Sequence, residues 1–392
     1  MVSDRHRRAR RRVPRHVAIA MIAVIISVAA CRDPGAAPTS PPAGATSAGP
    51  GTSGAPGPGA SGSAASPRST TGGPVASLPA SGTWARLEMD GPVPAAREDH
   101  TWTVAEDART AYLFGGRDGG EIFDDMWAYD LQAETWTRVR VRGDAPAPRF
   151  GHEGVWIPGR GLAIWAGQAG STFFDDLWLF EPGTGSWQLL PAGGQVPVAR
   201  YGSCSGLGPD GRLWISHGFT ADGTRFADTR AYDFVSGTWR KESISADGPF
   251  ERCLHACWWT SDGRFALYGG QTTGTPALGD LWFLTPGRGG TPTGTWAEAP
   301  APEPVARNLP AVARADSLAV LFGGRGLDGQ PLADTWLIPD GGTGFVALET
   351  GSGAPQARSG AAMVYDPARA RFVLFGGVGS DAFDDVWELT LP

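Results

Sequence analysis

The stretch FDDMW at 123–127 returns as FDDLW at 174–178 and as FDDVW at 383–387. Weaker versions of the phrase lie at 226–230, 278–282 and 332–336. Its second acidic position recurs at steps of 51, 52, 52, 54 and 51 residues, at Asp125, Asp176, Asp228, Asp280, Asp334 and Asp385. A phrase that returns at nearly constant pitch indicates a repeated architecture.

Two further landmarks keep this period. An apolar run ending in a small residue or pair, such as YLFGG at 112–116, precedes each phrase. Before that run lies an arginine, at Arg97, Arg149, Arg200, Arg252, Arg307 and Arg358. The apolar runs are short, are bounded by Gly, Pro and Asp, and lack the spacing of an amphipathic helix. Four short strands per unit predict an all-β propeller with one blade per unit, each first strand starting at the arginine.

The Gly-Gly pair after an apolar strand and the downstream tryptophan, as in GTW at 237–239, resemble kelch repeats over residues 83–392. The resemblance implies a six-bladed β-propeller of four-stranded kelch blades, like the central domain of galactose oxidase. The copper and cross-linked tyrosine ligands of that enzyme find no match here. Kelch propellers include both binding modules and enzymes, so the resemblance leaves the function open.

The sixth unit stops at WELTLP, 387–392, before its fourth strand. The missing piece lies near the other end of the chain, where SGTWARL at 81–87 matches SGTWRKE at 236–242. We therefore predict that residues 83–88 form the outer strand of the blade built from 358–391. This closure would cover an open sheet edge and lock the ring.

The repeated phrase is predicted to be structural. Its Phe and Trp would pack between blades, and its second Asp would be a turn residue accepting backbone N–H bonds. No unit supplies the clustered oxygen ligands of a calcium loop. The six arginines are also interpreted as structural, and pairing between the arginines and the aspartates is geometrically plausible.

Residues 1–30 predict a lipoprotein signal peptide. Seven arginines lie between Arg5 and Arg15, and the apolar segment 17–30 is too short to span a bilayer. VAAC at 28–31 resembles a bacterial lipobox, which implies lipidation of Cys31; an ordinary secretory signal is the alternative. Residues 31–82, rich in Gly, Ala, Pro, Ser and Thr, predict a disordered linker because they cannot bury enough apolar surface to fold. The predicted location is the bacterial cell envelope.

The charge balance argues against some partners. The formal net charge is −7, and residues 1–30 carry seven Arg and one Asp, so the remainder has 33 − 7 = 26 basic and 40 − 1 = 39 acidic groups, a net of −13. Such a domain is a poor nucleic-acid binder and is repelled by anionic lipid. We expect a monomer that meets the membrane only through its lipid anchor.

Three cysteines remain beside Cys31. Strand parity lets Cys204 of the third blade meet Cys257 of the fourth in a disulfide; buried free thiols are the alternative that we favour. Cys253, His255 and Cys257 alternate along one strand, where the ends lie too far apart for one metal ion to bind all three. No metal and no cofactor is expected.

The antiparallel order of the first two strands puts each arginine and the loop after Gly-Gly on one face of the disc, here called the loop face. The loops of this face are long, and variable loops on a rigid ring commonly bind partners. Candidate binding residues follow the arginines or begin these loops: Glu98, Asp99, His100, Arg117, Asp118, Phe150, His152, Gln168, Tyr201, Phe219, His255, Gln271, Asn308, Arg325 and Ser359.

Three of these candidates, His100, His152 and His255, stand three residues after an arginine. One interpretation is structural, with each side chain bonded to a neighbouring backbone. The other is a funnel of His, Asp and aromatic groups that takes a polar ligand or glycan.

The sequence thus predicts an envelope-tethered module that binds a protein or glycan partner through the loop face. A sugar-modifying enzyme of the kelch epimerase type is the alternative, with Glu98, Asp99 or the three histidines as acid/base candidates. A structural assembly protein is a third reading. No spaced set of residues singles out a catalytic centre.

Overall fold

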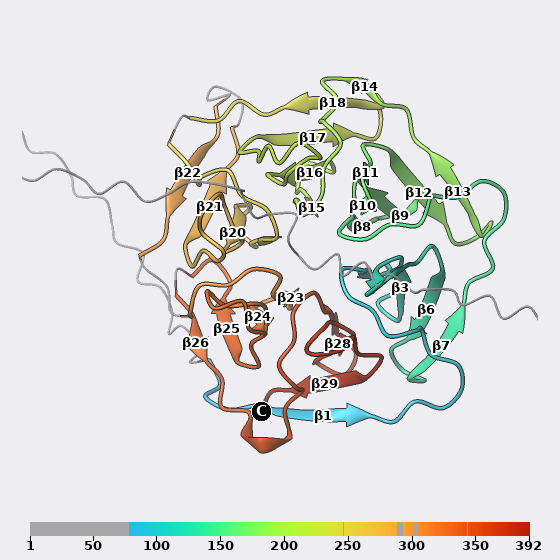
Figure 1. The fold of residues 1–392 in the computed structure, drawn as a ribbon, viewed down its shortest axis with the longest axis vertical. Coiled ribbons are helices and arrows are strands. Elements are labelled where there is room, and N and C mark those ends of the chain that lie inside the picture. Colours follow the sequence, from blue (N-terminus) through green and yellow to red (C-terminus); the bar gives the residue numbers. More distant parts are fainter. Residues whose placement is uncertain (1–77, 246, 288–292, 301–303, 343) are drawn as a thin grey trace, which may run out of the picture.

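The computed structural model describes residues 78–245, 247–287, 293–300, 304–342 and 344–392. Six four-stranded antiparallel sheets are arranged around a central axis, as Figure 1 shows. The predicted six-bladed propeller is confirmed. The predicted signal peptide, Cys31 and most of the predicted linker lie outside the described residues.

Each blade runs from an inner to an outer strand. The first three blades are β2 (Thr101–Val104), β3 (Thr110–Phe114), β6 (Met126–Asp130) and β7 (Thr135–Arg138); β8 (Glu153–Ile157), β9 (Gly161–Trp165), β12 (Leu177–Glu181) and β13 (Ser186–Leu189); and β15 (Cys204–Leu207), β16 (Leu213–Ser216), β17 (Thr229–Asp233) and β18 (Thr238–Lys241). The third blade gains a short parallel strand, β14 (Gly193–Gly194), beside β18.

The other three blades have the same order. They are β19 (Ala256–Trp259), β20 (Phe265–Tyr268), β21 (Leu281–Thr285) and β22 (Thr295–Glu298); β23 (Ala311–Arg314), β24 (Leu318–Phe322), β25 (Thr335–Pro339) and β26 (Val346–Ala347); and β27 (Ala362–Asp366), β28 (Arg371–Phe375), β29 (Val386–Thr390) and β1 (Thr83–Leu87).

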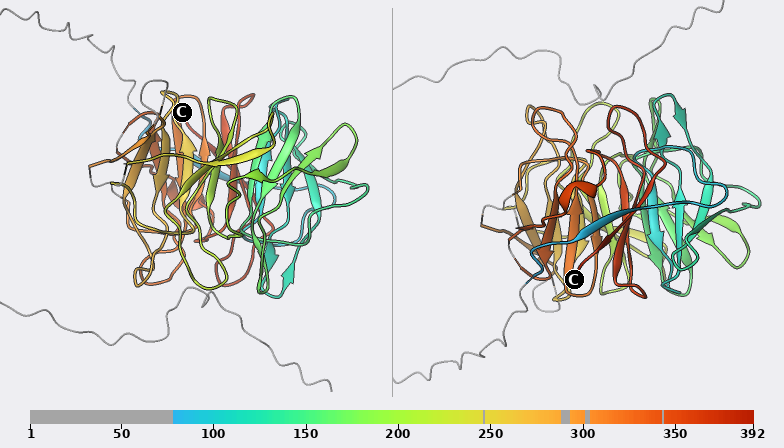
Figure 2. Two further views of the ribbon diagram at one scale, coloured as in Figure 1. Left: turned by 90° about the horizontal axis from the view of Figure 1, so that it is seen from above. Right: turned by 90° about the horizontal axis from the view of Figure 1, so that it is seen from below.

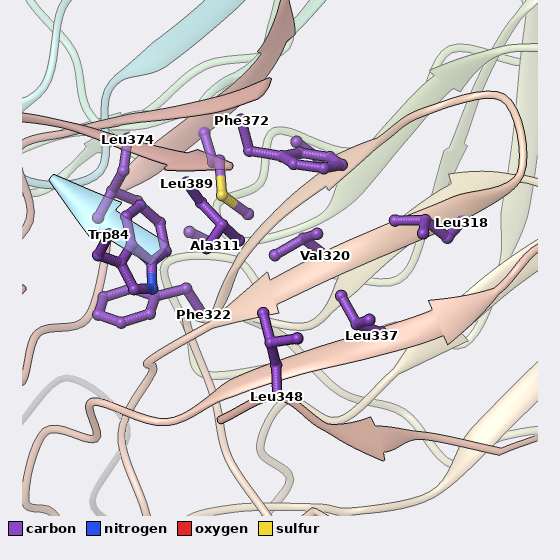
Figure 3. Packing of buried hydrophobic residues seen from close by; sticks show 12 residues of the cluster. Trp84, Ala311, Leu318, Val320, Phe322, Leu337, Leu348, Phe372, Leu374 and Leu389 are labelled. Carbon is purple, nitrogen blue, oxygen red and sulfur yellow. The ribbon is translucent and has the colours of Figure 1, made fainter. Parts of the chain in front are cut away.

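Strand β1 closes the ring. It pairs antiparallel with β29 from Thr83 opposite Thr390 to Leu87 opposite Val386, so the two ends of the described chain share the sixth blade. Trp84 is buried and packs edge-on against Phe322 of the fifth blade, with ring centroids 5.2 Å apart, as Figure 3 shows. Its indole Nε1 donates to Thr335 Oγ1 at 3.1 Å. Burial of this one side chain therefore joins the N-terminal strand to two blades.

The propeller begins earlier than the predicted boundary at residue 83. Leu78 packs against the same core as Trp84, and the Gly82 amide donates to the Glu349 carbonyl at 2.9 Å. Leu78 buries apolar surface against this core. It follows a stretch rich in Gly, Ala, Pro, Ser and Thr, so composition alone assigns it to the linker.

The first strand of each blade starts four residues after the arginine, not at it, as Thr101 follows Arg97. The residue two positions after each arginine has a left-handed backbone with φ between 51° and 66°; these six are Asp99, Gly151, Gly202, Leu254, Leu309 and Gly360. Such a residue cannot continue an extended strand. The strand prediction was wrong by this one turn.

These six left-handed residues form a closed backbone ring around the axis. Each amide donates to the carbonyl of its counterpart in the preceding blade, from Asp99 to Gly360 at 2.9 Å, from Gly151 to Asp99 at 2.8 Å, and so on through all six blades. The remaining distances lie between 2.7 and 3.3 Å. The backbone ring thus links every blade to both neighbours at the channel mouth on the loop face.

Side views show a disc with loops at both ends (Figure 2). On the loop face two hairpins project, β4 (Arg117–Asp118) with β5 (Glu121–Ile122), and β10 (Gln168–Ala169) with β11 (Thr172–Phe173). A 3₁₀ turn spans Gly351–Gly353. Nothing in the described part of the chain forms an apolar helix of membrane-spanning length.

Candidate functional site

The repeated phrase is explained by a buried ion pair in every blade. Arg97 is fully buried and donates from Nη1 and Nη2 to the two carboxylate oxygens of Asp125, at 2.6 and 3.1 Å. The Trp127 indole donates to Asp125 Oδ2 at 2.7 Å, and the Phe123 ring covers the guanidinium at 4.1 Å. Phe, Asp and Trp thus act together on one arginine. We predicted that this aspartate accepts backbone N–H bonds in the turn. Instead, its carboxylate accepts hydrogen bonds from the arginine and tryptophan side chains.

The same arginine–aspartate pair recurs in each of the six blades. Each arginine also donates from Nε to the carbonyl two residues earlier and from Nη1 to a carbonyl at the end of the second strand, as Arg149 does to Ala147 and Ala166. With its donors used in this way, the arginine holds the loop to the blade and is not available to a ligand.

The third blade departs from this pattern. Its phrase ends in Arg230 where the other five have Trp, and Arg230 Nε donates to Asp228 Oδ2 at 2.6 Å. Of the two Asp228 carboxylate oxygens, Arg200 therefore bonds only Oδ1, at 2.7 Å, and its Nη2 has no hydrogen-bond partner in the described part of the chain.

The residue after each arginine pairs with the residue after each Gly-Gly, as Glu98 does with Arg117. The first blade builds from this pairing a group of contacting side chains, here called the mouth cluster: Glu98, Asp99, Arg117, Phe150 and Tyr201. Arg117 donates from Nε to Glu98 Oε1 at 3.0 Å and from Nη2 to Asp99 Oδ2 at 3.1 Å. The Tyr201 hydroxyl donates to Asp99 Oδ2 at 3.0 Å, and Arg117 stacks on Phe150 at 4.2 Å.

Burial controls the electrostatics of the mouth cluster. Burial and the neighbouring Asp99 raise the pKa of Glu98 to about 7, although Arg117 and Arg325 oppose the shift. Burial and Asp99 also hold the pKa of Tyr201 well above its usual value. Burial alone would lower the pKa of Arg117, but Asp99, Tyr201 and Glu98 raise it. Glu98 Oε2 is buried without a hydrogen-bond partner among the described residues, which leaves one acceptor for a donor from outside.

The other candidates on the loop face form smaller contacts. Phe219 packs edge-on against Tyr201, and the Asn308 amide donates to Gln271 Oε1 at 3.2 Å. Arg325 Nη2 donates to Ser359 Oγ at 3.3 Å. Gln168 bonds the Gly170 carbonyl within its hairpin, and Asp118 is exposed. All six blades therefore contribute polar candidate side chains to the loop face.

The three histidines do not join this cluster. His100, His152 and His255 are buried, and their rings pack on Phe375, Phe114 and His217, each at 5.4 Å between centroids. The His152 ring lies against Gly115 of the preceding blade, where a Cβ would approach Cε1 to 2.8 Å. All three histidines nevertheless line the central channel cavity together with Asp99 and Tyr201, while their rings pack between blades.

Burial explains the titration of these histidines. Burial and the charge of Arg97 lower the pKa of His100 to about 3, and the pKa values of His152 and His255 are also held well below the usual value. All three are neutral at physiological pH.

Sequence reasoning missed Glu153. This residue lines a central channel cavity of about 260 Å³ formed by the first strands of all six blades. Although part of Glu153 is accessible from the channel, burial raises its pKa to about 8, and its Oε2 accepts from Ser205 Oγ at 3.1 Å. Its position four residues after Arg149, where other blades have Thr, Cys or Ala, was the available signal.

Cys204 and Cys257 form a disulfide between the third and fourth blades, with Cα atoms 5.8 Å apart. The predicted pairing of Cys204 with Cys257 is confirmed, and the preference for free thiols at these two positions was wrong. Cys253 is buried and is not part of this disulfide. Within the described ranges no group of three or more His, Cys, Asp or Glu side chains could hold a metal ion.

Comparison with known proteins gives a consistent similarity. The family model described as KLHDC2/KLHL20/DRC7 Kelch-repeats domain matches residues 76–270. Kelch domain-containing protein 3 of Bos taurus is 28% identical over 215 residues, which are 51% of this chain and 55% of the relative. Acyl-CoA-binding domain-containing protein 4 of Arabidopsis thaliana is 34% identical over 121 residues, 31% of this chain and 18% of the relative. This chain thus spans about half of the first relative and less than a fifth of the second.

Proposed function

We propose that this six-bladed β-propeller, which matches a kelch-repeats model over residues 76–270, is an interaction module tethered to the bacterial cell envelope that binds a protein partner through the mouth cluster. Kelch propellers generally bind proteins, and this fold presents one face of long loops on a rigid ring. The lipobox-like VAAC at 28–31 supports the tether.

The observation that carries the proposal is the unpartnered Glu98 Oε2 within an otherwise satisfied cluster. Arg117 already occupies Glu98 Oε1 and stacks on Phe150. A partner that brings an N–H or ammonium group to Oε2 satisfies the last acceptor, and a buried acceptor left unsatisfied costs about 1–3 kcal/mol. The partner chemistry is therefore a hydrogen-bond donor, such as a lysine side chain or a backbone amide.

The test uses the full-length protein in detergent-solubilised envelope, with chemical cross-linking and mass spectrometry. Glu98→Gln should lose the cross-linked partner, while Glu121→Gln, on the exposed β4–β5 hairpin, should keep it. Equal yields from both variants would remove the mouth cluster from recognition. If the captured species resists protease but is released by glycosidase, the partner is a glycan.

The tether has its own test. Cys31→Ser should release the protein from the membrane fraction, and the wild-type chain should take up a labelled fatty acid. A wild-type chain without label would mean that the signal is an ordinary secretory one.

One observation favours a second function, sugar-modifying catalysis. Glu98, with its pKa raised to about 7, lies beside the Asp99–Tyr201 hydrogen bond, and a carboxyl group that titrates near neutrality suits general acid–base chemistry. Exchange of solvent deuterium into reducing sugars, followed by proton NMR, would report such chemistry. Exchange that disappears in Glu98→Gln would favour the enzyme.

A further inference from the structure

A groove of about 520 Å³ lies between the third and fourth blades, away from the central channel. Its lining includes the arginine-rich end of the third blade and the outer strands of both blades, with the charged residues Arg200, Arg225, Asp228, Arg230, Lys241 and Glu242. In Figure 1 this region lies between β17 and β18 on one side and β22 on the other. It does not depend on the mouth cluster.

The groove is positively charged in an acidic protein. Four cationic side chains and two carboxylates line it, a formal excess of 4 − 2 = +2. The Glu242 carboxylate is bound by Arg212 and Arg240, and Asp228 is shared by Arg200 and Arg230. The described residues give Lys241 no ion pair, and the whole chain carries a formal charge of −7. Such a local field attracts anions.

Donors in the groove lack acceptors. Arg200 is fully buried, and its Nη2 bonds nothing described; in the other five blades that atom bonds the aspartate. Arg225 donates from Nη1 to Thr273 Oγ1 at 2.8 Å, but its buried Nε also lacks a described partner. Buried arginine donors are normally satisfied, so two such atoms at one groove point to an absent acceptor.

The cause is the replacement of the usual tryptophan by Arg230. In the other five blades this tryptophan donates to the second aspartate oxygen at 2.7 Å. Arg230 takes that oxygen instead and adds a charge, which displaces Arg200 Nη2 from the carboxylate. In the other five blades the Arg–Asp–Trp group is neutral and its hydrogen bonds are satisfied. In the third blade Arg230 gives the corresponding group a net positive charge.

We propose that this groove binds an oxyanion, a carboxylate, phosphate or sulfate, that is carried on an apolar body. Arg225, Arg230 and Lys241 supply the charge, and planar guanidinium groups suit oxyanions because they donate in a fork. Ile244, Pro249 and Trp296 line the remainder of the groove and suit the apolar body. A neutral apolar molecule would contact only the apolar lining of the groove, and a free inorganic anion would contact only its cationic side chains.

Isothermal titration calorimetry on the purified full-length protein tests the proposal with phenyl phosphate, inorganic phosphate and benzyl alcohol. Phenyl phosphate should bind, at least about tenfold more tightly than inorganic phosphate because only the former buries apolar surface. Its affinity should fall as salt is added. Absence of binding at millimolar phenyl phosphate, or equal binding of benzyl alcohol, would overturn the proposal.

The decisive variant is Arg230→Trp, which restores the residue of the other five blades and so keeps the fold. It should weaken phenyl phosphate at least about tenfold, since a charge-assisted hydrogen bond and a charge are lost. Lys241→Gln should weaken binding, while Arg138→Gln, its counterpart on the outer strand of the first blade, should not. Unchanged affinity in Arg230→Trp with an unchanged melting temperature would place the anion elsewhere.

Discussion

Arg149 donates to both carboxylate oxygens of Asp176, at 2.6 and 3.0 Å, across 27 residues of sequence. The arginine side chain is fully buried, whereas 28% of the aspartate side chain is exposed. The arginine charge is thus removed from water, and it is compensated by Asp176, by the Ala147 and Ala166 carbonyls and by the Phe174 ring. The same arginine–aspartate pair recurs in the five other blades, where it holds the loop of the loop face to the blade.

Arg149→Ala should lower the free energy of unfolding by about 3–5 kcal/mol, because the partner charge and several carbonyls lose their donors. Urea denaturation followed by tryptophan fluorescence measures the change. Asp175→Ala, at the exposed neighbouring position, is the control and should stay within about 0.5 kcal/mol of wild type. A mild effect in Arg149→Ala, equal to the control, would mean that the loop is held by other contacts.

Removal of residues 81–88 should lower the melting temperature well below that of a chain lacking only 32–77. The deletion removes β1 from β29 and the buried Trp84, whose truncation alone typically costs about 3–5 kcal/mol. The control keeps Leu78, since Leu78 packs against the same core. Equal melting temperatures by differential scanning calorimetry would show that the ring closes without β1.

His152→Ala should destabilise the fold by about 2 kcal/mol or more and leave partner binding intact in molecules that remain folded. The ring packs on Phe114, and its Nε2 lies 3.0 Å from Thr101 Oγ1. Asp118→Ala, exposed on the loop face, should change neither property. Chemical denaturation and the cross-linking assay separate the outcomes; a loss of binding without a loss of stability would restore His152 to the recognition surface.

Glu153→Gln should gain stability over wild type as the pH rises from 5 to 8. Burial raises the pKa of Glu153 to about 8 in the folded protein, above the unfolded value near 4.5. The unfolded chain therefore releases this proton first, and the wild type loses stability through that window while the glutamine variant does not. Urea midpoints at several pH values give the comparison. Glu121→Gln should follow the wild-type profile, and a pH-independent offset in Glu153→Gln would contradict the channel assignment.

Reduction should lower the melting temperature of the wild type but not that of Cys204→Ser. The disulfide spans 53 residues, and closing a loop of that size is worth about 2–4 kcal/mol. Cys253→Ala should remain sensitive to reductant because it keeps the disulfide. A wild type that melts at the same temperature with and without reductant would mean that the two thiols are not joined.

The fold could be predicted because its signals are local and sixfold. Gly-Gly, the arginine and the FDDxW phrase each mark one strand end, and SGTWARL at 81–87 identified the closing strand by its likeness to an internal repeat. The strand starts were misplaced because a left-handed turn leaves no residue signature where Leu254 or Leu309 occupies it. Those two positions read as ordinary strand residues.

The site was harder to predict, for a different physical reason. Composition and spacing collected the right residues at the mouth, but side-chain direction decides which of them meet. Tyr201 reaches Asp99 across two blade boundaries, whereas the His152 ring packs against Phe114 of the preceding blade. The Arg230 corner was visible as a departure from the phrase, yet its effect on Arg200 depends on which aspartate oxygen is free.

Closure by β1 also determines how the disc is held. Residues before Thr83 join the molecule at the outer edge of the sixth blade, across the ring from β18 in Figure 1. An attachment through the residues before Thr83 would therefore hold the propeller at the outer edge of its sixth blade. Such an attachment leaves both flat faces of the disc uncovered, and the outer edge at β18 lies on the opposite side of the ring from β1 (Figure 1).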